Sequence, residues 1–86
     1  MVSPLPKWAM QRYAILWSTF KTSEFAYNQV SDALKMNDTN MISALISNLR
    51  KNGWISARLD AQDSRKRMYQ LTSPEEAMKK MVEAAA

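Results

Sequence analysis

The stretch NDTNMISALISNLRKNGWISARLDAQDSRKRMYQLT, residues 37–72, decides the fold of this chain. In its first half, large apolar side chains recur at the spacing of one helical face, at Ile42, Leu45, Ile46 and Leu49. The opposite face carries short or polar side chains and no large apolar group, at Asn40, Ser43, Ala44, Ser47 and Lys51. A face of this kind lies close against a polar surface without losing much side-chain entropy. We therefore predict an amphipathic helix that buries one side and offers the other to a polar partner.

The second half of the stretch changes to a period of two residues. Gly53, the one glycine in the chain, follows the helical pattern and suits a C-cap, where a left-handed conformation is often needed. Apolar and polar residues then alternate over 54–59 and again over 66–71, and the tip DAQDSRKR, residues 60–67, connects the two runs, which predicts a β-hairpin. The loop carries three consecutive basic residues at 65–67. A helix that fits a groove, followed at once by a basic hairpin, is the order of a winged helix-turn-helix.

The hairpin also resembles the wing of the multiple-antibiotic-resistance regulator (MarR) family. The family pattern, roughly D-x-x-D-R-R-x-x-x-x-x-L-T, is matched without a gap by Asp60, Asp63, Arg65, Leu71 and Thr72. The segment before the hairpin also resembles the family. It is a helix followed by a glycine, a hydrophobic residue and an isoleucine, an order that many winged-helix families share. The resemblance covers residues 25 to about 74. It implies a winged-helix fold and DNA binding.

The resemblance also implies roles for two wing residues. Arg65 would be the arginine that reaches for the minor groove or a phosphate, and Asp63 would hold the wing in shape. Ser64 stands where the family often has a second arginine. The chain also lacks the long flanking helices that make the family's dimer and its ligand pocket, so a small-molecule effector is doubtful.

Length and composition bound the fold and exclude most enzymes. The 86 residues, 47% hydrophobic and 23% charged, suit one small globular domain. We expect a mostly helical α+β domain over 1–86, with the helix-turn-helix at 26–52, the wing at 54–71 and a C-terminal helix at 74–84. The chain has no histidine, no cysteine and a single glycine, which removes most metal sites, thiol nucleophiles and phosphate-binding loops. We expect no enzymatic activity and no cofactor or metal.

Charge and hydropathy point to the class of partner and the compartment. The net charge of +4 favours a polyanionic partner. The apolar run near the N-terminus is interrupted by Lys7, Arg12 and Lys21, so no span of about 20 apolar residues is available to cross a bilayer. We expect a cytoplasmic protein that does not enter the membrane.

The terminal segments predict an interface. A helix over 7–20 is apolar on more than one side, and SPEE at 73–76 is a capping box that starts a C-terminal helix. The excess apolar surface indicates a homodimer seam or a docking face, with the candidate residues Trp8, Tyr13, Trp17, Met78 and Met81. The alternative is that Trp8 and Trp17 close the bottom of a small core.

The segment between these helices, residues 22–36, begins the helix-turn-helix. Residues 23–25 suit a short third strand. A brief amphipathic helix follows, with apolar positions at Tyr27, Val30, Ala33 and Leu34. Residues 35–38 form the turn, with Asn37 or Asp38 as the N-cap of the next helix.

Two groups of residues are the candidate DNA contacts. On the helix, side chains that hydrogen-bond base edges or phosphates are Thr39, Asn40, Ser43, Ser47 and Asn48. The cationic group, suited to phosphates, is Arg50, Lys51, Arg58, Arg65, Lys66 and Arg67. The alternatives are a solvated helix face and a solvated loop. Trp54 and Tyr69 fit either base stacking or packing at the base of the sheet.

The function predicted from these residues is sequence-preferring binding of double-stranded DNA by a homodimeric transcriptional regulator, a repressor. No arginine or lysine lies between Thr39 and Leu49, so the helix should read bases modestly and rely more on shape and phosphate contacts. The alternative is a winged-helix protein-interaction module, or the N-terminal domain of a longer protein such as an antitoxin-type regulator.

Overall fold

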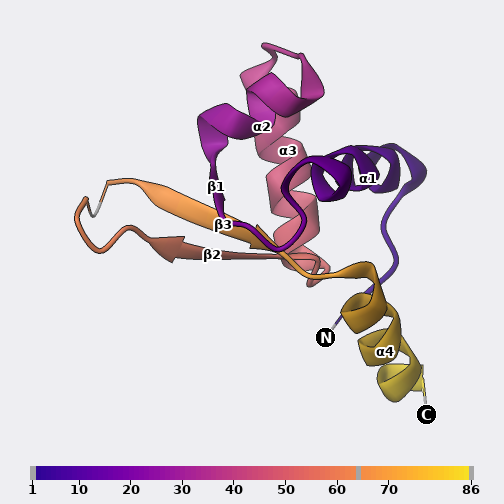
Figure 1. Ribbon diagram of the computed structural model, residues 1–86. Helices are drawn as coiled ribbons and strands as arrows, with labels where there is room; N and C mark the ends of the chain where they lie inside the picture. Colours follow the sequence, from indigo (N-terminus) through magenta and orange to yellow (C-terminus); the bar gives the residue numbers. More distant parts are fainter. Residues whose placement is uncertain (1, 64, 86) are drawn as a thin grey trace.

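The computed structural model describes residues 2–63 and 65–85 (Figure 1). Its helices are α1 (Lys7–Phe20), α2 (Tyr27–Leu34), α3 (Thr39–Lys51) and α4 (Pro74–Ala85). Its strands are β1 (Phe25–Ala26), β2 (Ile55–Leu59) and β3 (Arg67–Leu71). The first three helices form the core, β2 and β3 form the wing, and α4 follows the sheet. The predicted mostly helical α+β fold of a winged helix-turn-helix is confirmed.

The centre of the fold is the apolar stripe of α3. The four side chains predicted to be buried are between 0% and 6% exposed, and they are Ile42, Leu45, Ile46 and Leu49. They meet Leu16 of α1 and Val30 of α2, both fully buried, in one cluster. Burying a side chain of this size contributes roughly 1.5–3 kcal/mol. The stripe therefore fixes which side of α3 faces outward.

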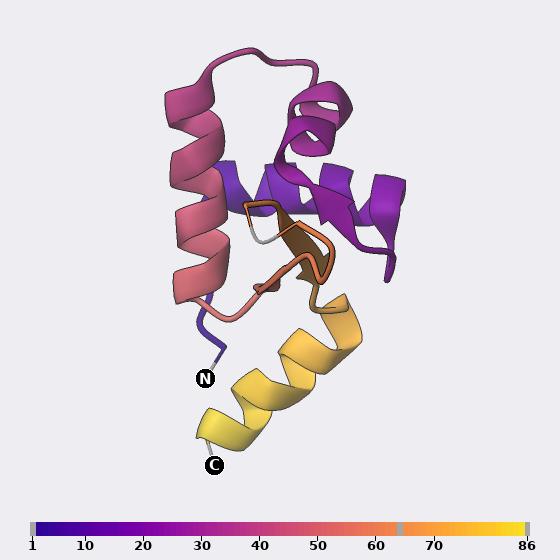
Figure 2. The ribbon, with the colours of Figure 1, turned by 90° about the vertical axis from the view of Figure 1, so that its left-hand side faces the viewer.

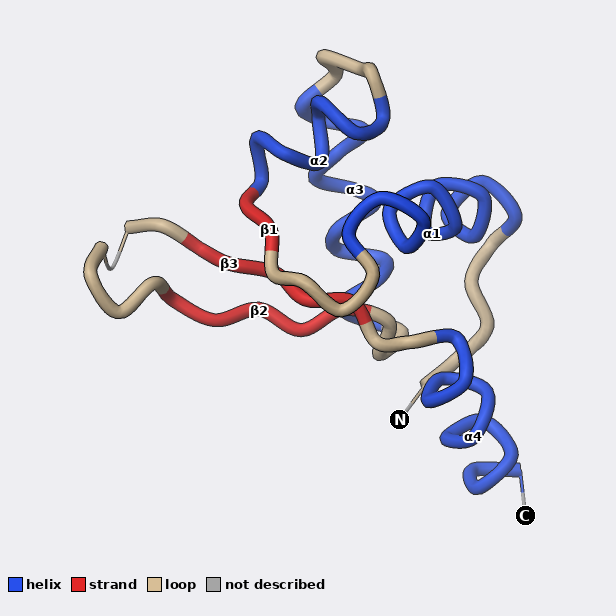
Figure 3. Tube along the Cα trace, in the orientation of Figure 1, coloured by secondary structure: helices blue, strands red, loops and turns tan. Residues whose placement is uncertain are grey.

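The sheet has three antiparallel strands in the order β1-β3-β2 (Figure 3). The third strand was predicted at 23–25 and lies at Phe25–Ala26. The shift follows from packing, because Phe25 is fully buried and stacks on Phe20 at a centroid distance of 4.4 Å. Ser23 and Glu24 remain exposed before the strand.

Local chemistry sets both ends of α3. Of the two N-cap candidates Asp38 is used, and its carboxylate accepts hydrogen bonds from the backbone N–H groups of Asn40 and Met41 at 3.0 and 3.2 Å. At the other end Gly53 has φ 82°, and its N–H donates to the carbonyl of Arg50 while the next N–H along the chain donates to that of Leu49. This pair of bonds is a Schellman motif, and it needs the positive φ that glycine tolerates.

Trp54 joins the start of the wing to α1 and to the N-terminal segment. Its side chain is 1% exposed, its indole N–H donates to the carbonyl of Ser3 at 2.6 Å, and its ring meets Tyr13 edge-on at 4.9 Å. The N–H of Ser3 donates in turn to the carbonyl of Asn52. The N-terminal segment therefore braces the turn between α3 and β2.

Helix α4 projects from the body at the end of the molecule away from the α2–α3 turn (Figure 2). Ala77 is buried against the body and Met81 is half-buried, whereas Met78 and Val82 are 54% and 69% exposed. No helix within residues 2–63 and 65–85 is long and apolar enough to cross a membrane.

Tyr13 gives a testable link between burial and pH. Its hydroxyl donates to the carbonyl of Thr72, and burial raises the pKa of Tyr13 to about 12. We expect Tyr13→Phe to lower the free energy of unfolding by roughly 1–2 kcal/mol near pH 8, because the Thr72 carbonyl loses its donor.

The pH dependence follows from the raised pKa. Above about pH 10 the tyrosine ionises in the unfolded chain and not in the folded one, which removes stability from the wild type as pH rises toward 12. The penalty of Tyr13→Phe should therefore shrink over that range in urea denaturation. A penalty that stays constant from about pH 8 to about pH 11 would contradict this account.

Candidate nucleic-acid interface

The outward face of α3 is the first part of the candidate site. Four of its predicted contact residues are exposed, and they are Thr39, Asn40, Ser43 and Ser47. The fifth, Asn48, is half-buried, and its side-chain oxygen accepts a bond from the Asn52 amide at 3.4 Å. The helix therefore presents a row of short polar groups with little apolar surface between them.

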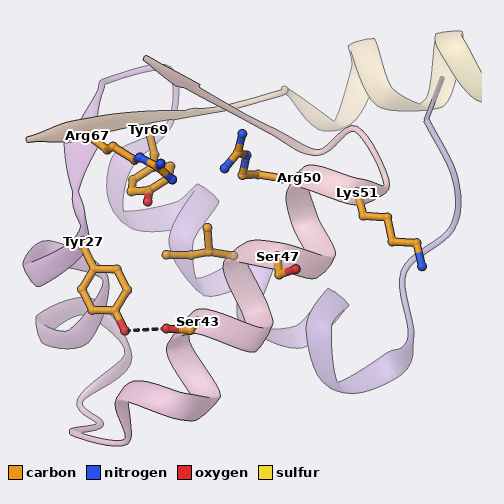
Figure 4. A pocket seen from close by; sticks show the side chains of 8 residues that line it. Tyr27, Ser43, Ser47, Arg50, Lys51, Arg67 and Tyr69 are labelled. Carbon is orange, nitrogen blue, oxygen red and sulfur yellow. Dashed lines mark hydrogen bonds between the residues drawn. The ribbon is translucent and has the colours of Figure 1, made fainter. Parts of the chain in front are cut away.

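This face forms one wall of a groove whose other wall is the wing (Figure 4). The groove has a volume of about 490 Å³. Helix α3 contributes Ser43, Ser47, Arg50 and Lys51, while β3 contributes Arg67 and Tyr69. Arg50 and Arg67 point into the same space, and Lys51 points away from it along the outside of α3. The polar helix face and the wing therefore open onto one side of the molecule.

A second hollow continues the groove toward the tip of the wing. It has a volume of about 440 Å³ and is lined by Arg65, Lys66 and Arg67. Among the described residues, no carboxylate lines either hollow. Because Arg50, Arg65, Lys66 and Arg67 line the two hollows without a counter-charge in the lining, their fields add and favour a polyanion. Histidine and cysteine are absent from the chain, and no three acidic side chains of the described residues are placed to hold a metal ion.

Two aspartates shape the tip that carries these cations. The carboxylate of Asp60 accepts from the backbone N–H of Gln62 at 2.9 Å, and that of Asp63 accepts from the N–H of Arg65 at 3.0 Å. The backbone also closes across the turn, from the N–H of Asp60 to the carbonyl of Lys66 at 2.8 Å. Asp63 therefore has the structural contact that the sequence implied. The departure from the family pattern at residue 64 lies outside the described residues.

Arg58 differs from the other predicted contacts in the face of the strand that carries it, although it also lines a smaller hollow with Arg50 and Arg67. In the strand register Ala57 pairs with Tyr69 and Leu59 with Arg67, so these four share the groove side of the wing. Arg58 alternates with them and falls on the reverse side. There its guanidinium binds both carboxylate oxygens of Glu24, at 2.5 and 2.8 Å, which lowers the pKa of Glu24.

Tyr27 is a groove residue that the sequence did not reveal. Its hydroxyl donates to the carbonyl of Thr39 at 3.0 Å and shares a hydrogen bond with the Ser43 hydroxyl at 3.1 Å (Figure 4). The sequence predicted that Tyr27 lies on the apolar side of a helix, and its ring is half-buried in the structure. No local pattern could indicate the hydroxyl's partners, because they lie 12 and 16 residues away.

The two aromatic residues that fitted either base stacking or packing are core residues. Trp54 is 1% and Tyr69 6% exposed, and both belong to the central cluster. Tyr69 reaches the groove as part of its floor. Base stacking needs an exposed ring face, so their burial favours packing at the base of the sheet.

Comparison with solved structures supports this arrangement. A mutant of MepR from S. aureus matches with a TM-score of 0.66 and 25% identity, over 93% of this chain and 54% of MepR. The S. aureus MepR–DNA complex matches with a TM-score of 0.63 and 19% identity, over 94% of this chain and 70% of that one. AdcR, the adhesin competence repressor of Streptococcus pyogenes, matches with a TM-score of 0.63 and 17% identity. The match covers 94% of this chain and 58% of AdcR. The fold is the MarR-type winged helix.

The likeness is one of structure, and it covers part of each matched protein. No protein-family model and no curated protein sequence matches this chain. The chain spans little more than half the length of the MepR mutant and of AdcR.

The predicted interface residues lie away from the groove, on the other helices of the winged helix. Tyr13 is 3% exposed and packs inside its own chain, so it has almost no surface to offer a partner. Trp8 and Trp17 are half-buried against the core, and each has a cation over its ring, from Arg12 at 6.0 Å and Lys21 at 5.7 Å. On α4 the two methionines differ, since Met78 is exposed and Met81 is half-buried.

The contact of Tyr27 with Ser43 can be tested through stability. We expect Tyr27→Phe to lower the free energy of unfolding by roughly 0.5–1 kcal/mol, because two hydrogen bonds in a half-exposed site are lost. Ser43→Ala should destabilise by a similar amount relative to Ser47→Ala, a matched exposed serine one turn away. Urea denaturation of the variants and of the Tyr27→Phe/Ser43→Ala pair measures the coupling. Strict additivity would show that the two hydroxyls do not interact.

Proposed function

We propose that this protein binds double-stranded DNA, with α3 in the major groove and the wing against the adjacent backbone or minor groove. The observation that carries the proposal is the shared groove, in which the polar face of α3 and the cations of β3 and the wing tip face the same way. A duplex presents phosphates on both sides of its major groove, so a helix and a cationic hairpin at a fixed spacing are complementary to it. The DNA complex of MepR, which has this fold, is a second support.

The roles of individual residues follow from their chemistry. Asn40 suits the paired donor and acceptor of adenine, and Ser43 and Ser47 suit several base edges. Thr39 and Asn48 would add contacts at the helix's margins. The side chains suited to phosphates are Arg50, Lys51, Lys66 and Arg67, and Arg65 suits the minor groove or its rim. We assign Arg58 to the wing's support instead of to DNA, because Glu24 already holds its guanidinium.

We further propose that the chain acts as a homodimeric transcriptional regulator in the cytoplasm, as a repressor. The whole of residues 1–86 would form one DNA-binding domain, with the helix-turn-helix at 26–52, the wing at 54–71 and the C-terminal helix at 74–84. Two-fold symmetry would then require two half-sites about one helical turn apart. The surfaces available for the dimer are the partly exposed residues of the first and last helices, Trp8, Trp17, Met78 and Met81.

The second candidate is a protein-docking module, and the exposed apolar side of α4 favours it. Met78 and Val82 lie one turn apart and are 54% and 69% exposed. Apolar surface of this kind on a small domain suits a protein partner. The two functions differ in their response to salt, because DNA binding weakens steeply with salt and apolar docking does not.

Arg65→Ala tests the DNA-binding proposal. We expect a loss of roughly 1–2 kcal/mol in binding to a duplex, about five- to thirtyfold in Kd, and a salt slope smaller by about 0.9. Fluorescence anisotropy with labelled duplex at several salt concentrations measures both quantities.

Lys79→Ala is the matched control, since Lys79 is an exposed cation on α4 away from the groove. It removes the same charge from the protein as Arg65→Ala does. If both variants lose the same affinity, binding would depend on net charge alone and the wing would have no specific role. Wild-type binding that is weak and insensitive to salt would instead favour the docking module.

The dimer proposal is tested at α4. Met78→Lys with Val82→Lys places two charges on an exposed apolar strip, where they should leave the monomer folded and disfavour association. We expect the double variant to sediment as a monomer at concentrations where the wild type is a dimer. A wild type that is monomeric throughout would refute the homodimer.

A further inference from the structure

The reverse side of the wing is tied to the segment that precedes β1. Glu24 binds Arg58 of β2 through both of its carboxylate oxygens, at 2.5 and 2.8 Å. Two residues earlier, the carbonyl of Thr22 accepts a hydrogen bond from the Gln70 amide of β3 at 2.7 Å. One short segment, residues 22–24, therefore holds both strands of the wing. We call this segment the brace.

Besides the brace, a short third strand joins the wing to the body. β1 is two residues long and pairs with β3 at Tyr69 and Met68, in the middle of that strand. Beyond that pairing the ladder has one more pair, Leu59 with Arg67, and this end of the two-stranded ribbon of β2 and β3 carries the cationic tip away from the body (Figure 1). Two-stranded hairpins are marginally stable in water and twist easily. The direction of the tip therefore depends on contacts at the ribbon's base.

The brace directly follows Lys21, whose backbone conformation is unusual. Lys21 is the C-cap of α1 and has φ 52° and ψ −123°, a conformation disfavoured for a residue with a side chain. Such a conformation costs free energy and persists when the surroundings hold it. The contacts that follow it at once are those of Thr22 and Glu24 with the wing.

We propose that Glu24 and Arg58 are positioning residues, which set the angle of the wing relative to α3 and so act on DNA through the wing. This inference rests on the proposed DNA binding and deepens it. Arg58 faces away from the groove in the strand register, and its guanidinium is already held by a carboxylate in a bidentate geometry. Its sequence-based assignment as a phosphate contact would require that pair to break.

Neutralising Glu24 tests the proposal through the direction in which the DNA affinity changes. A carboxylate near a DNA-binding surface repels phosphates, so its neutralisation should strengthen binding if charge alone matters. If Glu24 holds the wing, the same change should weaken binding. A phosphate contact by Arg58 and a positioning role therefore predict opposite effects for Glu24→Gln.

The experiment compares Glu24→Gln, Arg58→Gln and the charge swap Glu24→Arg with Arg58→Glu, in anisotropy titrations at several salt concentrations. We expect Glu24→Gln and Arg58→Gln each to weaken duplex binding about three- to fivefold, the effect of losing an exposed ion pair. The salt slope should stay at the wild-type value for both. The swap should bind within about twofold of wild type, because it restores the pair at the same net charge.

Glu76→Gln is the matched control, because Glu76 also forms an exposed ion pair, with Lys80 on α4 at 3.8 Å. It should bind DNA as the wild type does. Glu24→Gln that binds as tightly as the wild type or tighter would overturn the proposal, and so would Arg58→Gln that lowers the salt slope by about 0.9 as a phosphate contact does.

A measurement without DNA separates this proposal from the proposed function. Hydrogen exchange of the Asp60 amide, which bonds to Lys66 across the ribbon, reports how firmly the wing is held. We expect exchange at that amide to be about threefold faster in Glu24→Gln and restored in the swap. Unchanged exchange would overturn the brace. Faster exchange in Glu24→Gln, together with a wild type that does not bind DNA, would uphold the brace and refute DNA binding.

Discussion

The structure depends on burial of one stripe of α3. Ile42, Leu45 and Leu49 are at most 1% exposed, and they occupy the centre of the cluster that joins all three core helices to the sheet. Rotating α3 by about a third of a turn would expose these side chains and bury Ser43 and Ser47, at a cost of several kcal/mol in total. The polar face of α3 therefore points outward because its apolar face must be buried in the core.

The same burial determines where the wing starts. α3 ends in a Schellman motif at Gly53. The side chain of the next residue, Trp54, is buried in the core, where it contacts the N-terminal segment and Tyr13. β2 therefore leaves the end of α3 in one direction, and β3 pairs antiparallel with it as the central strand of the sheet. Because no flexible linker intervenes, the core sets where the wing begins relative to the helix face, and the brace then acts on the direction of its tip. A groove of fixed width is what a duplex of fixed groove dimensions requires.

The sequence was informative where local chemistry decides the structure. The buried stripe of α3, the glycine at its end and the alternation of the hairpin are local patterns, and the structure has each of them. The family resemblance implied the role of Asp63, and its carboxylate does accept a hydrogen bond inside the wing. The start of β1 was less accurate, because Phe25 is placed by stacking on Phe20 and not by a strand pattern. Tyr13 was assigned to an interface because a helix with apolar residues on several sides looked too apolar for one small core. In the structure Trp54 and the N-terminal segment use that surface.

Arg58 shows why cations in a sequence cannot be assigned to one surface by composition. Arg58 and Arg67 are both strand arginines of the same hairpin, and only the register separates them. One faces a hollow without carboxylates and the other faces Glu24, 34 residues away in the chain. Since α3 itself carries no cation before Arg50, the attraction to a polyanion is concentrated at the helix's end and on the wing. Affinity would then depend on holding these two regions at the spacing of successive phosphates, and so on rigid geometry more than on the number of charges.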